Sequence, residues 1–224
     1  MIDPAVAPLG FTDYDRHYFK RSRGALQDVF FLDPDRQVRN FYVQVGIHLP
    51  ASHDRGVFID GIDQPTAIIS HRLGKHSDPP DSNRAYGCHT FAQLKMSVPK
   101  LIDELKRFAL PWYELFQSVR DVAAEWKRIR IDPRPKWLVK QAGPEQPDPF
   151  AWAEYGWLLE QMGELDEAKG WWHKAYDEIT RPVFQKGGQL ALDGTHGAAG
   201  VRRTAEEERL EESLRQSLRL RVEK

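Results

Sequence analysis

The sequence contains a single cysteine and no long apolar run. With only Cys88 among 224 residues, an intrachain disulfide and a metal site made of thiolates alone are both excluded. The N-terminus lacks the basic start and apolar stretch of a signal peptide. The longest uncharged stretch of the first half, residues 40–53, is too short and too polar to cross a bilayer. We therefore expect a cytoplasmic protein with no membrane partner.

The chain also lacks an excess of charge of one sign. Lysine and arginine number 32 and aspartate and glutamate 33, which gives a net charge of −1. A nucleic-acid-binding protein usually carries a basic excess gathered on one surface. We therefore expect no nucleic acid among the partners of this protein.

Glutamate and tryptophan are missing from the first part of the chain. Residues 1–103 contain no glutamate, and all seven tryptophans follow residue 111. Glutamate favours helix interiors, whereas the aspartates of the first part favour turns and helix caps. We therefore predict an α+β fold, in which an N-terminal antiparallel sheet covered by helices is followed by a helical hairpin and a C-terminal helix.

The strongest strand signal is the alternation of apolar and polar residues over residues 37–49, which is typical of a half-buried strand. A hairpin that turns at Gly24 is predicted before it, and the Asp33-Pro34-Asp35 sequence is predicted to turn the chain into the long strand. The remaining expected segments are strands at 17–23, 26–32, 56–59, 65–73 and 87–94, and an exposed loop at 74–83.

Helices are predicted from Ser97 onward, with Ser97 as the N-cap and Pro99 in the first turn. Pro111 is expected to break or kink this helix, and a further helix is predicted over residues 119–130. An α+β domain is thus expected over residues 1–130. The five segments of the predicted organisation are 1–130, a proline-rich connection at 131–147, a helical hairpin at 148–182, a glycine-rich linker at 183–203 and a helix at 204–224.

The hairpin at 148–182 combines small residues, which let two helices approach, with aromatic residues that fill the sides. The residues that carry the pattern are Trp152, Gly156, Leu159, Gly163, Ala168, Trp172, Ala175 and Pro182. In this pattern the hairpin resembles a single tetratricopeptide repeat. Because one repeat cannot bury its own faces, it must either dock on the rest of the chain or offer a groove to a peptide.

Short motifs in the first part follow one another in a characteristic order. They are Pro8-Leu9-Gly10-Phe11, a strand ending in Lys20-Arg21, the strand Phe41-Tyr42-Val43-Gln44-Val45-Gly46-Ile47, His71-Arg72-Leu73-Gly74 and Ala109-Leu110-Pro111-Trp112-Tyr113. This succession, over roughly residues 5–120, resembles the bacterial domain-of-unknown-function family 4304. Members usually begin with a fuller helix than the seven residues that precede Pro8. The resemblance implies a compact α+β domain and supplies no catalytic residues.

Signals for chemistry are sparse. His48 and His53 are five residues apart, as are His71 and His76, but neither pair belongs to a HExxH or paired-cysteine motif. No dinucleotide-binding, Walker or Gly-x-Ser-x-Gly motif occurs. We therefore expect ordinary histidines, no metal, no cofactor and no catalytic residue.

The candidate binding surface follows from the alternation in the long strand. Tyr42, Gln44 and His48 are predicted on the face opposite the apolar residues, and His71 or Arg72 from a nearby strand is predicted to join them. Helices that cover only the apolar face would leave these side chains open to a partner. The favoured hypothesis is a non-enzymatic module that binds another protein. Neutralisation of a toxin by an immunity- or antitoxin-like protein is one concrete version, which rests on analogy of fold.

An enzyme with a His/Asp/Arg pocket on the same face is the alternative hypothesis. Its candidate groups are His48, His71, Arg72 and Asp60. Convergence of these groups in one concave pocket would favour the enzyme, whereas their scatter would favour a binding surface.

The linker prediction is testable by limited proteolysis of the folded chain. Residues 183–203 hold five glycines and few apolar side chains, so this segment has little to bury and should be cut first. Mass spectrometry of the first fragments locates the cut. A first cut within residues 37–49 would contradict both this prediction and the strand assigned there.

Overall fold

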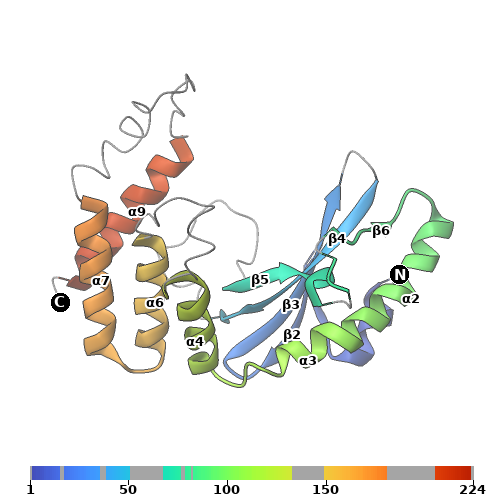
Figure 1. The fold of residues 1–224 in the computed structure, drawn as a ribbon, viewed down its shortest axis with the longest axis horizontal. Coiled ribbons are helices and arrows are strands. Elements are labelled where there is room, and N and C mark those ends of the chain that lie inside the picture. The colour runs from blue at the N-terminus through green and yellow to red at the C-terminus, as the bar shows by residue number, and fades with distance from the viewer. Residues whose placement is uncertain are drawn as a thin grey trace. The chain divides into compact units, whose positions relative to one another are not determined.

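After a short N-terminal helix, α1 (Asp3–Val6), and a helical turn, η1 (Ala7–Leu9), the strands come first and the longer helices follow (Figure 1). The predicted α+β fold class is therefore confirmed. The computed structural model describes residues 2–15, 18–35, 39–50, 68–76, 79–81, 83–132, 149–180 and 205–222. The predicted linker at 183–203, most of the connection at 131–147 and the predicted strand at 56–59 lie outside the described residues. The chain divides into two compact units, and the division falls between Val122 and Ala123.

The first unit contains an antiparallel sheet in the order β1-β2-β3-β4-β5, and β6 also pairs with β4. The predicted hairpin is present, since β2 and β3 pair in register from Tyr18 with Phe31 to Arg23 with Leu26. Gly24, in the turn, has a φ of 63°, a conformation that glycine adopts at little cost. The strands are β1 (Asp13–Asp15), β2 (Tyr18–Arg23), β3 (Leu26–Asp35), β4 (Asn40–His48), β5 (Ile69–Arg72) and β6 (Tyr86–Gly87).

The turn predicted at Asp33-Pro34-Asp35 is wrong, because β3 continues through these residues to Asp35. Among the described residues, β2 pairs with β3 as far as Phe31, and the last residues of β3 pair with β4 alone. Proline is tolerated at such an edge, where its missing N–H is not needed by a second neighbour. The Pro34 ring can therefore stand in the strand.

The predicted strand at 87–94 is also wrong beyond Gly87, because α2 (Phe91–Glu104) begins within it. Thr90 is the N-cap: its hydroxyl accepts from the backbone N–H of Gln93, and the Gln93 side chain accepts from the backbone N–H of Thr90. This capping box satisfies two amides that a helix start leaves open. Ser97, predicted as the cap, lies inside the helix and donates its hydroxyl to the Gly87 carbonyl at 2.9 Å.

The helix does not break at Pro111. A π-helical segment, η4 (Leu105–Ala109), joins α2 to α3 (Leu110–Tyr113), and the Leu110 N–H bonds the carbonyl of Leu105. In a regular α-helix the proline ring clashes with the carbonyl four residues earlier. The wider turn immediately before Pro111 lets the chain continue in the same direction, across one face of the sheet (Figure 1).

The loop predicted at 74–83 is only partly exposed. It opens with a short helix, η3 (Leu73–His76), in which Leu73 and Gly74 are buried. A Cβ at position 74 would lie 1.9 Å from the Asp81 carbonyl oxygen, so only glycine fits. Pro79, Pro80 and Asp81 are exposed, as predicted.

A buried carboxylate ties the sheet to α3. Asp28 of β3 is fully buried and bonds Arg21 and Arg23 of β2, with N–O distances of 2.6 Å to each guanidinium. Arg23 also donates to the backbone carbonyls of Tyr113 and Phe116, at 2.9 and 3.0 Å. These carbonyls lie at and beyond the end of α3, where helix geometry leaves acceptors unpaired. The ion cluster therefore fixes where the helix ends on the sheet.

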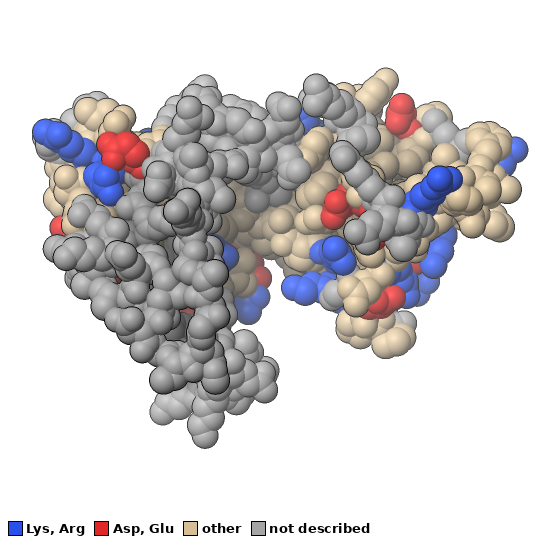
Figure 2. All heavy atoms as spheres, turned by 90° about the horizontal axis from the view of Figure 1, so that it is seen from above, with Lys and Arg blue, Asp and Glu red and all other residues tan. Residues whose placement is uncertain are grey.

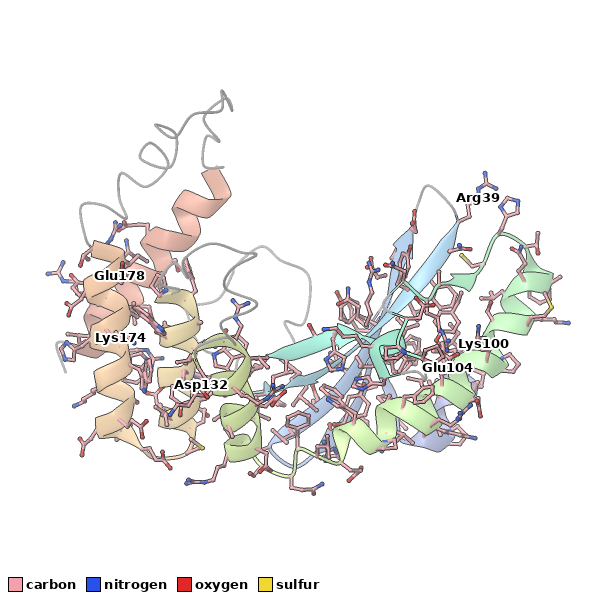
Figure 3. The ribbon with its side chains drawn as sticks, in the orientation of Figure 1. Arg39, Lys100, Glu104, Asp132, Lys174 and Glu178 are labelled. Atoms are coloured by element: carbon pink, nitrogen blue, oxygen red, sulfur yellow. The ribbon has the colours of Figure 1, made fainter. Side chains whose placement is uncertain are left out.

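A second buried carboxylate, that of Glu104, joins the sheet to helix α2. Glu104 projects from α2 toward the strands (Figure 3) and is 4% exposed. It accepts from the Tyr86 hydroxyl at 2.5 Å and from Arg84 at 2.8 Å. Burial is the main cause that raises the pKa of Tyr86 above its ordinary value, followed by the bond to Glu104, so the phenol stays protonated and continues to donate.

Substitution of Asp28 tests whether its ion pairs with Arg21 and Arg23 stabilise the first unit. Asp28→Ala leaves two partly buried guanidinium groups without their carboxylate, and breaking a buried ion pair in this way costs about 3 kcal/mol. The control is Asp103→Ala, whose carboxylate pairs with Arg107 on an exposed helix face and should contribute less than about 1 kcal/mol. Urea unfolding of both variants measures the two losses. Equal losses would contradict the anchoring role of Asp28.

The second unit is helical. The segment that resembles a tetratricopeptide repeat forms the helices α6 (Pro149–Gln161) and α7 (Leu165–Thr180), and Gly163 turns the chain between them with a φ of 79°. Trp126, from α4 (Val119–Arg130), donates its indole N–H to the Ala151 carbonyl at 3.1 Å. The hairpin is therefore docked on α4 within this unit.

The C-terminal helix α9 (Ala205–Val222) packs against α7. Leu214 and Leu218 of this helix are buried, at 0% and 1% exposed. Arg221 pairs with Glu160 of α6 at 2.5 Å and lies over the Trp172 ring at 4.8 Å. A helical hairpin that cannot bury both of its own faces thus receives packing partners from the same chain.

Two glycines in the hairpin make a matched test of its packing. A Cβ on Gly156 would lie 2.5 Å from the Trp172 indole nitrogen and 3.1 Å from the Ala168 carbonyl oxygen, whereas nothing lies within 4 Å of one on Gly170. Overpacking costs about 1–3 kcal/mol, so Gly156→Ala should destabilise the protein. Gly170→Ala should stabilise it by about 0.5–1 kcal/mol, because alanine favours helix. Thermal unfolding compares them, and stabilisation by both would contradict the close contact.

Candidate functional site

Strand register decides which side chains share each face of the sheet. Gln44 of β4 pairs with Phe31 of β3 and with Arg72 of β5, and Tyr42 pairs with Asp33. Directly opposed residues in an antiparallel sheet point to the same face. The structure therefore brings Tyr42, Gln44 and Arg72 together, on the face opposite the one that α2 and α3 cover. We call this the Tyr42 face, with Tyr18, Phe31, Asp33, Tyr42, Gln44 and Arg72 as its members.

The members of the Tyr42 face contact one another in pairs. The Arg72 guanidinium lies 4.1 Å from the centre of the Tyr42 ring, a distance at which the cation is attracted to the ring face. Gln44 donates to Asp33 at 3.4 Å. Tyr18 is buried, while Tyr42, Gln44 and Arg72 are half-buried. The side chains are thus held in defined positions while parts of them remain accessible.

His48 belongs to the same face of β4, as predicted, but it is not available to solvent. Its side chain is 1% exposed, and its Nδ1 bonds the Gln27 side-chain oxygen at 3.0 Å. Register explains the bond, because Gln27 is the residue that pairs with His48. The expectation that His48 would be presented to a partner is therefore corrected: this end of the face is closed.

His71 lies on the opposite face from Arg72, which corrects its predicted place in the binding surface. Adjacent residues of a strand point to opposite sides, and His71 pairs with the inward-facing Val45. Its ring contacts the Trp112 ring of α3, with centroids 4.5 Å apart, and the ring of His76. Burial, and to a smaller extent the charge of Lys75, lowers the pKa of His76.

The groups proposed for an enzymatic pocket do not converge. His48 and Arg72 share a face but are at different ends of it, His71 is on the other face, and Asp60 lies outside the described residues. The two buried carboxylates, Asp28 and Glu104, are engaged in ties to the helix layer. Within the described part of the chain no group of three or more His, Cys, Asp or Glu side chains is placed to hold a metal ion.

Charge is mixed on the surface seen in Figure 2. Among its coloured residues, basic and acidic side chains are interspersed with uncharged ones, in line with the net charge of −1. Of the helices in the described ranges, none is both long and apolar enough to cross a membrane.

Phe31 and Asp33 are members of the Tyr42 face that the sequence did not indicate. The pairing of Tyr18 with Phe31 follows from the two-residue turn at Gly24, because a turn of known length fixes the register of a hairpin. Asp33 was missed because the sequence predicts a turn, and not a strand, at Asp33-Pro34-Asp35. In the structure β3 continues through Asp35, and Asp33 pairs with Tyr42.

Comparison with known proteins finds no family model, no curated protein and no solved structure that matches the chain. The resemblance of residues 5–120 to family 4304 therefore stays a prediction, and the chemistry of the Tyr42 face has to carry the functional argument.

Proposed function

We propose that this protein is a non-enzymatic interaction module that binds another protein through the Tyr42 face. The observation that carries the proposal is the stacking of Arg72 on Tyr42 on a face of the sheet where both side chains are half-buried. Tyrosine and arginine are enriched among the residues that dominate the energy of protein interfaces. An arginine already held against an aromatic ring loses less conformational entropy when a partner covers it.

Recognition fits this face better than catalysis does. Apart from the buried His48, the members of this face are aromatic rings, an amide, a guanidinium and the carboxylate of Asp33, which accepts from Gln44. This set offers hydrogen bonds and apolar area, whereas acid–base or nucleophilic catalysis needs a reactive group beside its base. The scatter of His48, His71 and Arg72 supports the same choice, by the criterion set from the sequence.

A finer version of the proposal is an immunity- or antitoxin-like role in the cytoplasm of a bacterium. It is supported by the resemblance to a bacterial family and by the α+β fold, both of which are analogies at the level of the whole domain. In this version the partner is a toxic protein whose active surface the Tyr42 face would cover.

Site-specific photo-crosslinking tests the proposal in the full chain. A photoreactive amino acid replaces Ser70, which is exposed on β5 and lies on the Tyr42 face opposite Gly46. The control places the same group at Ala92, exposed on α2 at the helix-covered side. In native lysate, the probe at position 70 should capture one discrete protein that the probe at position 92 does not.

A second substitution separates specific from adventitious capture. Arg72→Ala removes the stacked guanidinium and should weaken capture from position 70 about tenfold, which corresponds to about 1.4 kcal/mol of binding energy. Arg107→Ala, on an exposed part of η4, should leave it unchanged. The same proteins captured from both positions, or capture that is unaffected by Arg72→Ala, would refute the proposal.

A further inference from the structure

The side chains of His71 and His76 contact each other through the Nε2 atom of each ring. The short helix η3 follows β5 directly and reverses the chain, so the histidine at the end of η3 folds back onto the one in the strand. Their Nε2 atoms are hydrogen-bond partners, and their ring centroids are 4.3 Å apart. Two histidines that are five residues apart in the sequence, a spacing that predicts no contact in an extended chain, are thus in direct contact.

A third ring holds the pair in place. Trp112 of α3 contacts His71 edge to face, with centroids 4.5 Å apart and an angle of 76°, and contacts His76 at 5.6 Å. Phe116 in turn packs edge-on against Trp112 at 5.1 Å. The two imidazoles are therefore positioned from three elements, β5, η3 and α3, before any ligand arrives.

We propose that His71 and His76 form a two-imidazole binding site for a divalent transition metal ion such as Cu²⁺ or Zn²⁺. The Nε2 atom of a neutral imidazole carries either a proton or a lone pair. Two such atoms that face each other can share one proton, or both can direct lone pairs at one metal ion, and imidazole is the commonest protein ligand for these metals.

The geometry needs little change to take the ion. Metal–nitrogen bonds to histidine are about 2.0–2.1 Å long, so the two Nε2 atoms have to stand about 3 Å apart. Rotation of half-buried rings about their side-chain bonds supplies this. The described residues add no third His, Cys, Asp or Glu, so water completes the coordination and the ion exchanges with solvent. Nitrogen ligands favour Cu²⁺ over Zn²⁺ in affinity.

This site is independent of the Tyr42 face, because it lies on the other side of the sheet from it. The metal-site proposal therefore stands or fails independently of whether a protein partner binds the Tyr42 face. What the pair and Trp112 predict together is a metal-dependent optical signal, since Cu²⁺ quenches the emission of an indole that it approaches closely. Trp112 is the only one of the seven tryptophans that precedes residue 126.

Titration of the chelator-treated full chain with Cu²⁺ tests the site. Isothermal calorimetry should show one tightest site, with at least tenfold weaker binding in both His71→Gln and His76→Gln. The control is His173→Gln, whose side chain is exposed on α7 and whose loss should leave that site unchanged. Glutamine retains a hydrogen-bonding side chain, and thermal unfolding without metal establishes that each variant folds.

Tryptophan emission gives a readout that survives if a histidine variant fails to fold. Cu²⁺ should quench part of the wild-type emission. Trp112→Phe removes the indole that contacts both imidazoles and should lose that part of the quenching. Unchanged affinity in both pair variants, an equal loss in His173→Gln, or full quenching in Trp112→Phe would overturn the proposal. The first of these results would mean that the two rings share only a proton.

Discussion

The buried Asp28 carboxylate is the constraint on which the first unit depends. It cannot remain charged in the interior without cationic partners, and Arg21 and Arg23 supply them from the neighbouring strand. Because Arg23 also bonds the carbonyls of Tyr113 and Phe116, the same interaction that satisfies the charge sets where the helix layer ends. Tyr113, buried beside it, donates its hydroxyl to the Val29 carbonyl at 2.6 Å. Strand pairing and helix position are thus fixed together.

This anchoring gives the two faces of the sheet different roles. The helix-covered face carries the ion cluster, the Glu104 tie and the histidine pair, all of them contacts between strands and helices. The opposite face keeps aromatic and polar side chains that contact one another within the sheet. Residues that do not hold the fold together are the ones available for recognition, which is why the proposed partner surface lies there.

In the second unit, α4 and α9 pack against the helical hairpin formed by α6 and α7. Small residues let α6 and α7 approach so closely that a Cβ on Gly156 would overlap the Trp172 indole, and α9 packs against α7 with two buried leucines. A hairpin capped in this way needs no further repeats to bury its apolar surface. The buried Trp172 packs inside the hairpin, and its ring also makes a cation–π contact with the guanidinium of Arg221.

Periodicity in the sequence determined the α+β class, the hairpin at Gly24, the long strand and the two helices of the second unit, because alternation and small-residue spacing are local properties. It also placed Tyr42 and Gln44 on one face. It misplaced the start of α2, since Ser97 and Thr90 are both good caps and only the capping box with Gln93 distinguishes them. Tertiary structure alone decided that His48 is buried and bonded to Gln27, that His71 contacts Trp112, and that His71 contacts His76. These outcomes depend on which strands pair and where the chain reverses, and such long-range pairings leave no trace in the spacing of residues along the chain.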